Sequence, residues 1–405
     1  MLHHVIGLAL LALAACDGDA KQVTPPPPPP PSDAGLLDAG GGGQLLAFPA
    51  IRCAECHNKM HDEWSTSAHA RAATSPAYLK MREGAGADGA GCDDCHAPLA
   101  RRLHPGDLAL AEGVTCEACH SIKAVTVRRT GAGYELSLGR VKYGPLCDAK
   151  DHYFHRMGCS KLHAEATICA GCHLYYRPLP GGGELPVFTE YDEWHEGPYQ
   201  ARECQSCHMA GARAEVAVGA GVRNGVAHHG WLGKQRDLRA RALTASALVT
   251  AVPDPANKGK LRIEVSVQNV GAGHAVPSGL PERRIVVRAT ALAAGGAKQA
   301  AAEQAFGRIL VDAAGKPAPF YAAVRVAADD RIPPKQSRKA RLELEAPKAG
   351  ELRLEVIWRP LAEEIRTPLE IPAADDVPLL HATVALRPSQ AWGRPDLPRT
   401  IELER

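Results

Sequence analysis

Apolar and polar residues alternate with a period of two in the C-terminal part of the chain. From Leu261 to Val267 every apolar residue is followed by a polar one, which predicts a β-strand with one buried and one exposed face. Similar patterns, separated by turn residues, occur at 285–287, 320–326, 342–344 and 352–358. Strands at this spacing, with no helices between them, predict an antiparallel, immunoglobulin-like β-sandwich over residues 241–405.

Residues 49–240 lack this period. Pro and Gly clusters such as 178–183 interrupt the segment, so we expect short helices and loops with little regular structure. A β-hairpin is predicted where residues 124–127 and 134–138 alternate around a Gly-containing turn. The predicted fold class is therefore α+β, with a mostly helical and loop domain at 49–240 followed by the β-sandwich.

The N-terminus has the pattern of a targeting segment. Residues 5–15 form an apolar run that is shorter than the roughly 20 residues of a membrane span. The run ends in Leu-Ala-Ala-Cys16, which resembles a bacterial lipobox. We therefore predict a lipoprotein signal peptide at 1–15 and lipidation of Cys16. The alternative is an ordinary cleaved signal peptide with an unmodified Cys16.

Residues 16–48 are predicted to be a disordered tether, because they contain seven consecutive prolines and a run of glycines. Together with the signal segment, this predicts an extracytoplasmic protein, lipid-anchored to a bacterial membrane and facing the periplasm or the cell surface. The formal net charge of +2 lacks the basic excess of a nucleic-acid-binding protein.

Cysteine and histidine carry the chemistry, with 13 and 18 residues in the chain. Ten of the cysteines belong to five Cys-x-x-Cys-His motifs, a spacing typical of covalent haem c attachment. Two Cys one helical turn apart can bond the two vinyl groups of a porphyrin, and the following His can bind its iron. The predicted cofactor-binding residues are Cys53, Cys56, His57, Cys92, Cys95, His96, Cys116, Cys119, His120, Cys169, Cys172, His173, Cys204, Cys207 and His208.

Zinc sites and redox dithiols are the alternatives for such cysteine pairs. Neither requires a His after every second Cys, and five of five by chance is on the order of one in 10^7. The segment that contains the motifs has roughly 31 residues per motif. So short a stretch cannot enclose its own porphyrin, so we expect the haems to stack against one another and form the core. That arrangement also accounts for an aromatic content of only 5%.

Five haems would also change the charge balance. Their propionates would add about −10 charges, so the formal +2 becomes about −8. We therefore expect a redox partner with a basic surface and an association rate that depends on ionic strength.

Cys147 and Cys159 lie outside the motifs. Two cysteines left over in an extracytoplasmic protein predict a disulfide. Such a bond would stabilise the fold by roughly 3 kcal/mol. A free, reactive pair of thiols is the alternative.

Several segments between the motifs resemble multihaem cytochromes similar to the nitrifier tetrahaem cytochrome c. These segments are Trp64 to His69, Gly113-Val114 before Cys116, Tyr143 to Leu146, Leu162-His163, Glu193-Trp194, His229 to Gly233, and the sequence NVGAGHAVPSGLPERR at 269–284. The resemblance covers about residues 50–360. It implies a pentahaem variant of that family, in a lipid-anchored form with a C-terminal β-sandwich.

The resemblance also implies histidines as second axial ligands. Residue by residue, the candidate distal ligands are His69, His155 or His163, His229 and His274, with His104 and His228 in reserve. With the motif histidines His57, His96, His120, His173 and His208, they form the predicted set of iron ligands. We further expect the sandwich to supply His274 to a haem of the other domain. Paired histidine ligands imply low reduction potentials.

The predicted function is extracytoplasmic electron transfer through stacked, mainly bis-His haems. Redox partners would be other cytochromes or an outer-membrane conduit. Two alternatives remain: a multihaem oxidoreductase acting on small nitrogen compounds at a five-coordinate haem, and a subunit of an outer-membrane electron conduit. No catalytic residue is assigned, and no nucleic-acid partner is expected.

Overall fold

The computed structural model describes residues 47–103, 108–231, 236–252, 260–345, 349–387 and 397–405. The predicted signal peptide, the lipidation site at Cys16, nearly all of the tether, and the reserve ligand His104 lie outside these ranges. Every described residue belongs to one compact unit.

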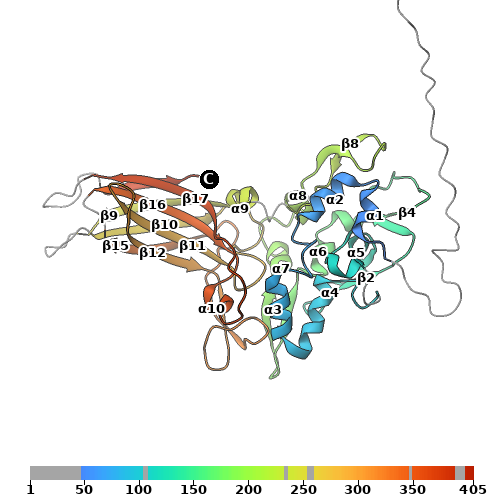
Figure 1. Ribbon diagram of the computed structural model, residues 1–405, viewed down its shortest axis with the longest axis horizontal. Helices are drawn as coiled ribbons and strands as arrows, with labels where there is room; N and C mark the ends of the chain where they lie inside the picture. Colours follow the sequence, from blue (N-terminus) through green and yellow to red (C-terminus); the bar gives the residue numbers. More distant parts are fainter. Residues whose placement is uncertain (1–46, 104–107, 232–235, 253–259, 346–348, 388–396) are drawn as a thin grey trace, which may run out of the picture. The chain divides into compact units, whose positions relative to one another are not determined.

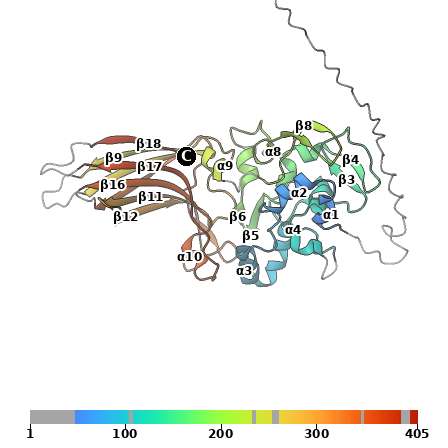
Figure 2. The same ribbon diagram turned by 45° about the horizontal axis from the view of Figure 1, so that its top comes forward.

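The C-terminal region contains two four-stranded antiparallel sheets (Figure 1). The first sheet has the order β15 (Ser337–Glu345), β10 (Lys260–Asn269), β9 (Leu243–Ala251) and β18 (Arg399–Leu403). The second has the order β12 (Lys298–Phe306), β11 (Arg284–Ala293), β16 (Gly350–Arg359) and β17 (Val377–Leu386). Figure 2 shows β18 at the edge of the first sheet, beside β9. The predicted mixed α+β fold is therefore correct.

The alternation read from the sequence decides which face of β10 is buried. Leu261, Ile263, Val265 and Val267 are fully buried in one cluster with side chains of both sheets. Each such burial contributes about 1.5–3 kcal/mol. Arg262 lies on the opposite face, where it pairs with Glu343 of β15 at 2.9 Å.

One predicted strand begins in the wrong place. Residues 320–322 form a turn, in which the Pro319 carbonyl accepts from the amides of Ala322 and Ala323. Strand β14 (Arg325–Asp329) follows the turn and pairs with β13 (Arg308–Val311). Phe320 and Tyr321 pack with Met81 in a separate apolar cluster, which accounts for apolar residues at these positions without a strand.

The N-terminal region has the short helices that the sequence predicts, and it also has several small two-stranded sheets where loops and a single hairpin are predicted. Its helices are α1 (Ala50–Ala54), α2 (Asn58–Ser65), α3 (Pro76–Gly84), α4 (Asp93–His96), α5 (Cys116–His120), α6 (Thr167–Ala170), α7 (Glu190–His195) and α8 (Cys204–His208). Short 3₁₀ helices lie at η2 (Gly86–Cys92), η3 (Leu108–Glu112) and η4 (Lys161–Ala164).

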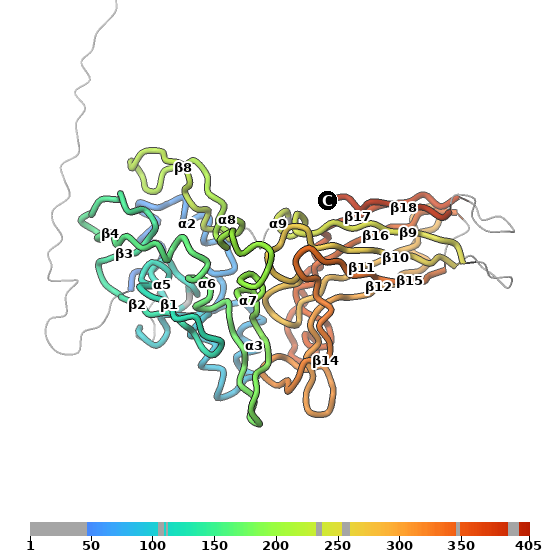
Figure 3. Tube along the Cα trace, turned by 180° about the vertical axis from the view of Figure 1, so that it is seen from behind, coloured from blue at the N-terminus to red at the C-terminus, as the bar shows by residue number. Residues whose placement is uncertain are grey.

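The predicted hairpin is present as β1 (Ile122–Val125) paired with β2 (Tyr134–Leu136). The other two-stranded sheets join β3 (Val141–Gly144) to β4 (Arg156–Cys159), β5 (Tyr175–Pro178) to β6 (Glu184–Phe188), and β7 (Ala212–Glu215) to β8 (Val222–Val226). Helix α9 (Arg236–Ala242) leads into β9, as the trace in Figure 3 shows, and α10 (Glu363–Arg366) follows β16. Across the described ranges, no helix combines the length and apolar character of a membrane span.

Candidate multihaem site

Each motif is built around one helical turn, which brings its second Cys and its His close to its first Cys. In the first motif the His57 amide donates to the Cys53 carbonyl at 2.8 Å, and in the fourth His173 donates to Cys169 at the same distance. The third motif, in α5, has Thr115 as its N-cap, and the Thr115 hydroxyl accepts from Ala118 at 2.9 Å. The spacing of the motif is thus expressed directly as local structure.

All five motifs line one continuous cavity. Its volume is about 3130 Å³, several times the roughly 300–1,000 Å³ of a single small-molecule site. Every motif cysteine and every motif histidine contributes to its wall, as do His69, His155, His163, His229 and His274. A cavity of this size, lined by attachment residues throughout, fits several large planar groups.

Four motif histidines face a second histidine across this cavity. With metal–nitrogen bonds of about 2 Å, two imidazoles that bind one metal from opposite sides have ring centres roughly 6 Å apart. The observed separations are 6.2 Å for His57–His155, 6.2 Å for His173–His69, 6.2 Å for His208–His274 and 6.3 Å for His120–His229. These pairs therefore have the spacing of axial ligands.

Backbone carbonyls orient many of these rings. In five rings the Nδ1 atom pairs with a carbonyl oxygen, at 2.5 Å in His57, 3.0 Å in His96, 2.7 Å in His120, 2.9 Å in His229 and 3.1 Å in His274. A ring held through Nδ1 keeps Nε2 available for a metal. Burial also lowers the pKa of His69 and of His120 to about 3, so both rings are neutral at pH 7, the state that binds a metal.

His163, one of the predicted alternatives, is placed differently. Its ring lies 5.8 Å from His120 and nearly parallel to it, at 9°. Its Nε2 atom, however, pairs with the carbonyl of Cys119 at 3.2 Å, so this nitrogen is already engaged next to the proximal histidine. His229, whose Nε2 remains available, is the better partner for His120.

His96 of the second motif has a different neighbour. The Tyr78 ring stacks on it at 4.5 Å and 16°, which is too close for a porphyrin to lie between them. In the described part of the chain, no histidine ring lies opposite His96 at the spacing of the four pairs.

Tyr78 is held by an acidic residue inside the second motif. Its hydroxyl donates to Asp93, and Arg82 pairs with the same carboxylate at 2.7 and 2.8 Å. Hydrogen bonds from Arg82 lower the pKa of Asp93, whereas burial raises the pKa of Tyr78. Sequence reasoning missed this group, although the Asp at the first variable position of the motif was a signal.

Cysteines of different motifs contact one another within the cavity. The thiol of Cys53 contacts Cys116, Cys172 contacts Cys95, and Cys169 contacts Cys204. The fourth motif therefore touches both the second and the fifth.

A zinc site would need about four converging ligands, and over the described residues no three His, Cys, Asp or Glu side chains converge on one point.

Cys147 and Cys159 are joined by a disulfide in the structure. The enclosed loop carries His155, the ring that faces His57. The bridge thus restrains a segment that supplies one member of a histidine pair.

His274 reaches the cavity from the C-terminal region on a loop with fixed ends. The Asn269 side chain donates to the carbonyls of His274 and Ile332, at 2.9 and 3.1 Å. Val276 and Ile332 exchange backbone hydrogen bonds on the other side of the loop. The loop therefore brings His274 to the cavity, and its role as an iron ligand stays a prediction.

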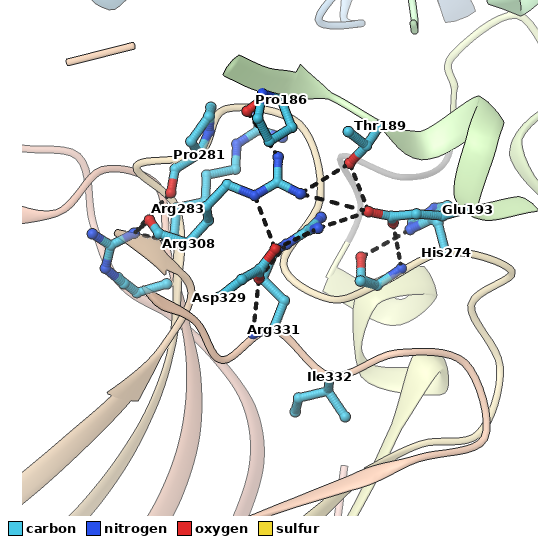
Figure 4. Close-up of polar contacts among 12 residues, drawn as sticks. Pro186, Thr189, Glu193, His274, Pro281, Arg283, Arg308, Asp329, Arg331 and Ile332 are labelled. Carbon is cyan, nitrogen blue, oxygen red and sulfur yellow. Dashed lines mark hydrogen bonds and ion pairs between the residues drawn. The ribbon is translucent and has the colours of Figure 1, made fainter. Parts of the chain in front are cut away.

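A charged cluster fastens this loop to α7 (Figure 4). Glu193 accepts from the Ala275 amide at 2.8 Å and pairs with Arg331 at 2.7 Å. Arg331 and Arg308 both pair with Asp329, each at 2.9 Å. The position of His274 therefore depends on ion pairs between segments far apart in the sequence.

We expect Asp329→Asn to reduce the free energy of unfolding at pH 7 by about 2 kcal/mol. This value lies between the usual cost of breaking an exposed ion pair and that of breaking a buried one. Burial raises the pKa of Asp329, but Arg331 and Arg308 hold it below its ordinary value. A carboxylate whose pKa is lower in the folded protein than in the unfolded chain stabilises the fold when the pH is above the unfolded pKa. This stabilisation is lost as the pH falls through the folded pKa.

Denaturant titrations of Asp329→Asn and the unsubstituted protein should therefore differ at pH 7 and converge below about pH 4. Glu264→Gln, which removes an exposed pair with Lys339, is the matched control and should change little. Equal stability of Asp329→Asn and the unsubstituted protein at pH 7 would contradict the role of this cluster.

Comparisons with known proteins agree with this geometry. Residues 52–121, which contain the first three motifs, match the family described as cytochrome c554 and c-prime. This match supports the resemblance seen in the sequence over that segment. No curated protein matches the chain.

A solved structure extends the comparison to most of the chain. It is the crystal structure of a penta-heme cytochrome c552 from Thermochromatium tepidum, with a TM-score of 0.65 and 23% sequence identity. The match covers 84% of this chain and 99% of that chain. Five motifs on one cavity agree with the prediction of five covalent haems c, and this chain shares the fold of that penta-heme cytochrome.

Proposed function

We propose that the chain is a pentahaem c-type cytochrome that transfers electrons outside the cytoplasm. The observation that carries the proposal is the set of four histidine pairs, each at about 6 Å, in a single cavity lined by all five attachment motifs. A bound haem supplies an iron that gains and loses one electron. The chain supplies the attachment, the axial imidazoles and the exclusion of water.

The histidine pairs support a specific role for each ring. His155, His229, His69 and His274 would be the distal ligands opposite His57, His120, His173 and His208. Paired imidazoles favour low-spin iron at low potential. Because Cys172 contacts Cys95 and Cys169 contacts Cys204, haems attached to the second, fourth and fifth motifs would lie close enough for direct electron transfer.

The proposed location and partners are supported by features of the sequence. The signal segment, Cys16 and the Pro/Gly-rich tether support lipid anchoring to a bacterial membrane. The charge of about −8 expected with five haems favours a redox partner with a basic surface, either another cytochrome or a protein of an outer-membrane conduit.

A second function is favoured by His96. With Tyr78 stacked on one side and no described histidine opposite, a haem at the second motif would offer an open coordination position. Such a position could bind a small nitrogen compound, as the alternative of a multihaem oxidoreductase requires. Electron transfer remains the main proposal, because the other four motif histidines have partners.

The test is a mass measurement followed by a redox-titrated EPR spectrum of the purified mature protein. We expect five covalent haems, four low-spin centres and one high-spin centre. A colourless protein, or a mass without five haems, would overturn the proposal. A spectrum dominated by high-spin iron would instead overturn the assignment of paired ligands.

Replacing His229 or His163 tests the assignment at the third motif. We expect His229→Ala to convert one low-spin haem to high spin, because it removes the ring whose Nε2 is available. His163→Ala should keep all low-spin signals, because the Nε2 of His163 pairs with the Cys119 carbonyl. EPR spectra of the two variants show which histidine is the ligand. If His163→Ala, and not His229→Ala, converts a low-spin haem to high spin, His163 is the ligand.

A further inference from the structure

A half-buried arginine lies on the cavity wall at the end of the sandwich nearest the His274 loop. Arg239, from α9, places its guanidinium carbon 3.6 Å from the centre of the Trp358 ring. Arg283 approaches the same ring at 5.6 Å. All three residues line the cavity that contains the attachment motifs. Two cations therefore share one aromatic surface inside the protein.

The charge of Arg239 is not balanced by a neighbouring acid. Burial and the proximity of Arg283 lower the pKa of Arg239 to about 10, and no carboxylate among the described residues forms an ion pair with it within 4.0 Å. Even a partly buried guanidinium without an anion has an unfavourable desolvation cost. Stacking on Trp358 recovers only part of that cost.

Arg283 has acidic neighbours, but their contacts are mostly with the backbone. Glu190 accepts from the Gly279 amide, and Glu282 accepts from the Phe320 amide at 2.9 Å. The Nε atom of Arg283 is buried without a hydrogen-bond partner.

Both arginines flank the loop that carries His274. At its start, the Ala242 carbonyl at the end of α9 accepts from Val270 at 2.9 Å and from Gly271 at 3.2 Å. At its other end, Arg283 donates to the Ser278 carbonyl at 2.8 Å. The two cations are thus tied to the segment whose histidine faces His208 across 6.2 Å.

We propose that Arg239, together with Arg283, binds a carboxylate, and that this carboxylate is a propionate of the haem held between His208 and His274. The inference rests on the proposed function, because the haem must be present. A propionate is attached within the same cavity, so its effective concentration far exceeds that of a free anion. Nearby cations also stabilise the ferrous state, which carries one positive charge less than the ferric state, and so raise the potential of this haem.

The test compares Arg239→Gln with Arg239→Lys by redox-titrated EPR. We expect Arg239→Gln to lower the midpoint potential of one haem, identified as the one whose low-spin signal disappears in His274→Ala. Arg239→Lys should retain most of the original potential, because it keeps the charge. Arg262→Gln, on an exposed strand face of the sandwich, is the matched control and should leave every potential unchanged.

Two outcomes would overturn the inference. If Arg239→Gln and Arg283→Gln have the same midpoint potentials as the control variant, the two arginines do not bind an anion. If added formate shifts the potential of the unsubstituted protein and Arg239→Gln abolishes that shift, the carboxylate comes from solution and is not a propionate. A haem count of five in every variant separates these outcomes from a failure of the proposed function.

Discussion

Removing the second motif with Cys92→Ala and Cys95→Ala should abolish carbon monoxide binding by the reduced protein. His96 is the motif histidine that has Tyr78 stacked against it and no described histidine opposite. The haem attached there would be five-coordinate when reduced, and an open position on ferrous haem binds carbon monoxide. The other four haems would hold two imidazoles each and resist the ligand.

The measurement is the difference spectrum of the reduced protein with and without carbon monoxide. We expect about one haem equivalent to respond in the unsubstituted protein and essentially none in the double variant. The matched control is Cys53→Ala with Cys56→Ala, which removes a haem with paired ligands and should leave the response intact. An unsubstituted protein that fails to bind carbon monoxide would show that the second haem has a sixth ligand, and His104→Ala would then test the reserve histidine.

The attachment residues could be predicted from the sequence alone because the chemistry acts locally. Two thioether bonds and one metal bond to the same porphyrin fix the spacing of Cys, Cys and His within one helical turn. The structure folds these segments accordingly, with the amide of His57 bonded to the carbonyl of Cys53. No long-range information is needed to find these fifteen residues.

The pairing of the distal histidines could not be read from the sequence. His155 and His163 both precede the fourth motif, yet His155 faces His57 of the first motif. His163 instead bonds a carbonyl beside His120. Which ring reaches which metal depends on contacts between segments distant in the sequence, and no local spacing encodes them.

The same distinction applies to the strands. Strand β10 could be predicted because Leu261, Ile263 and Val265 alternate with polar residues and pack in the core. Strand β12 could not, because its sequence, KQAAAEQAF, consists largely of good helix formers. It forms a strand because β11 offers an edge for pairing, with Ile285 opposite Phe306. Tertiary pairing here overrides local preference.

Replacing His274 by alanine should convert the haem opposite His208 from low spin to high spin. The two rings lie 6.2 Å apart and within 20° of parallel, and burial lowers the pKa of His208 to about 4, so the proximal imidazole is neutral and keeps its place. Asn269 holds the loop through the backbone carbonyl of His274, which alanine retains. The loop should therefore stay folded and lose only the imidazole.

EPR of the oxidised protein measures this change. We expect about one quarter of the low-spin intensity to become high spin, and the loss should be partly reversed by added imidazole, which can enter the space left by the side chain. His381→Ala, on β17 and outside the cavity lining, is the matched control and should leave the spectrum unchanged. If the His274→Ala spectrum kept its full low-spin intensity, the sandwich would supply no ligand, and the cluster of Glu193, Arg331 and Asp329 would serve only to join the two regions.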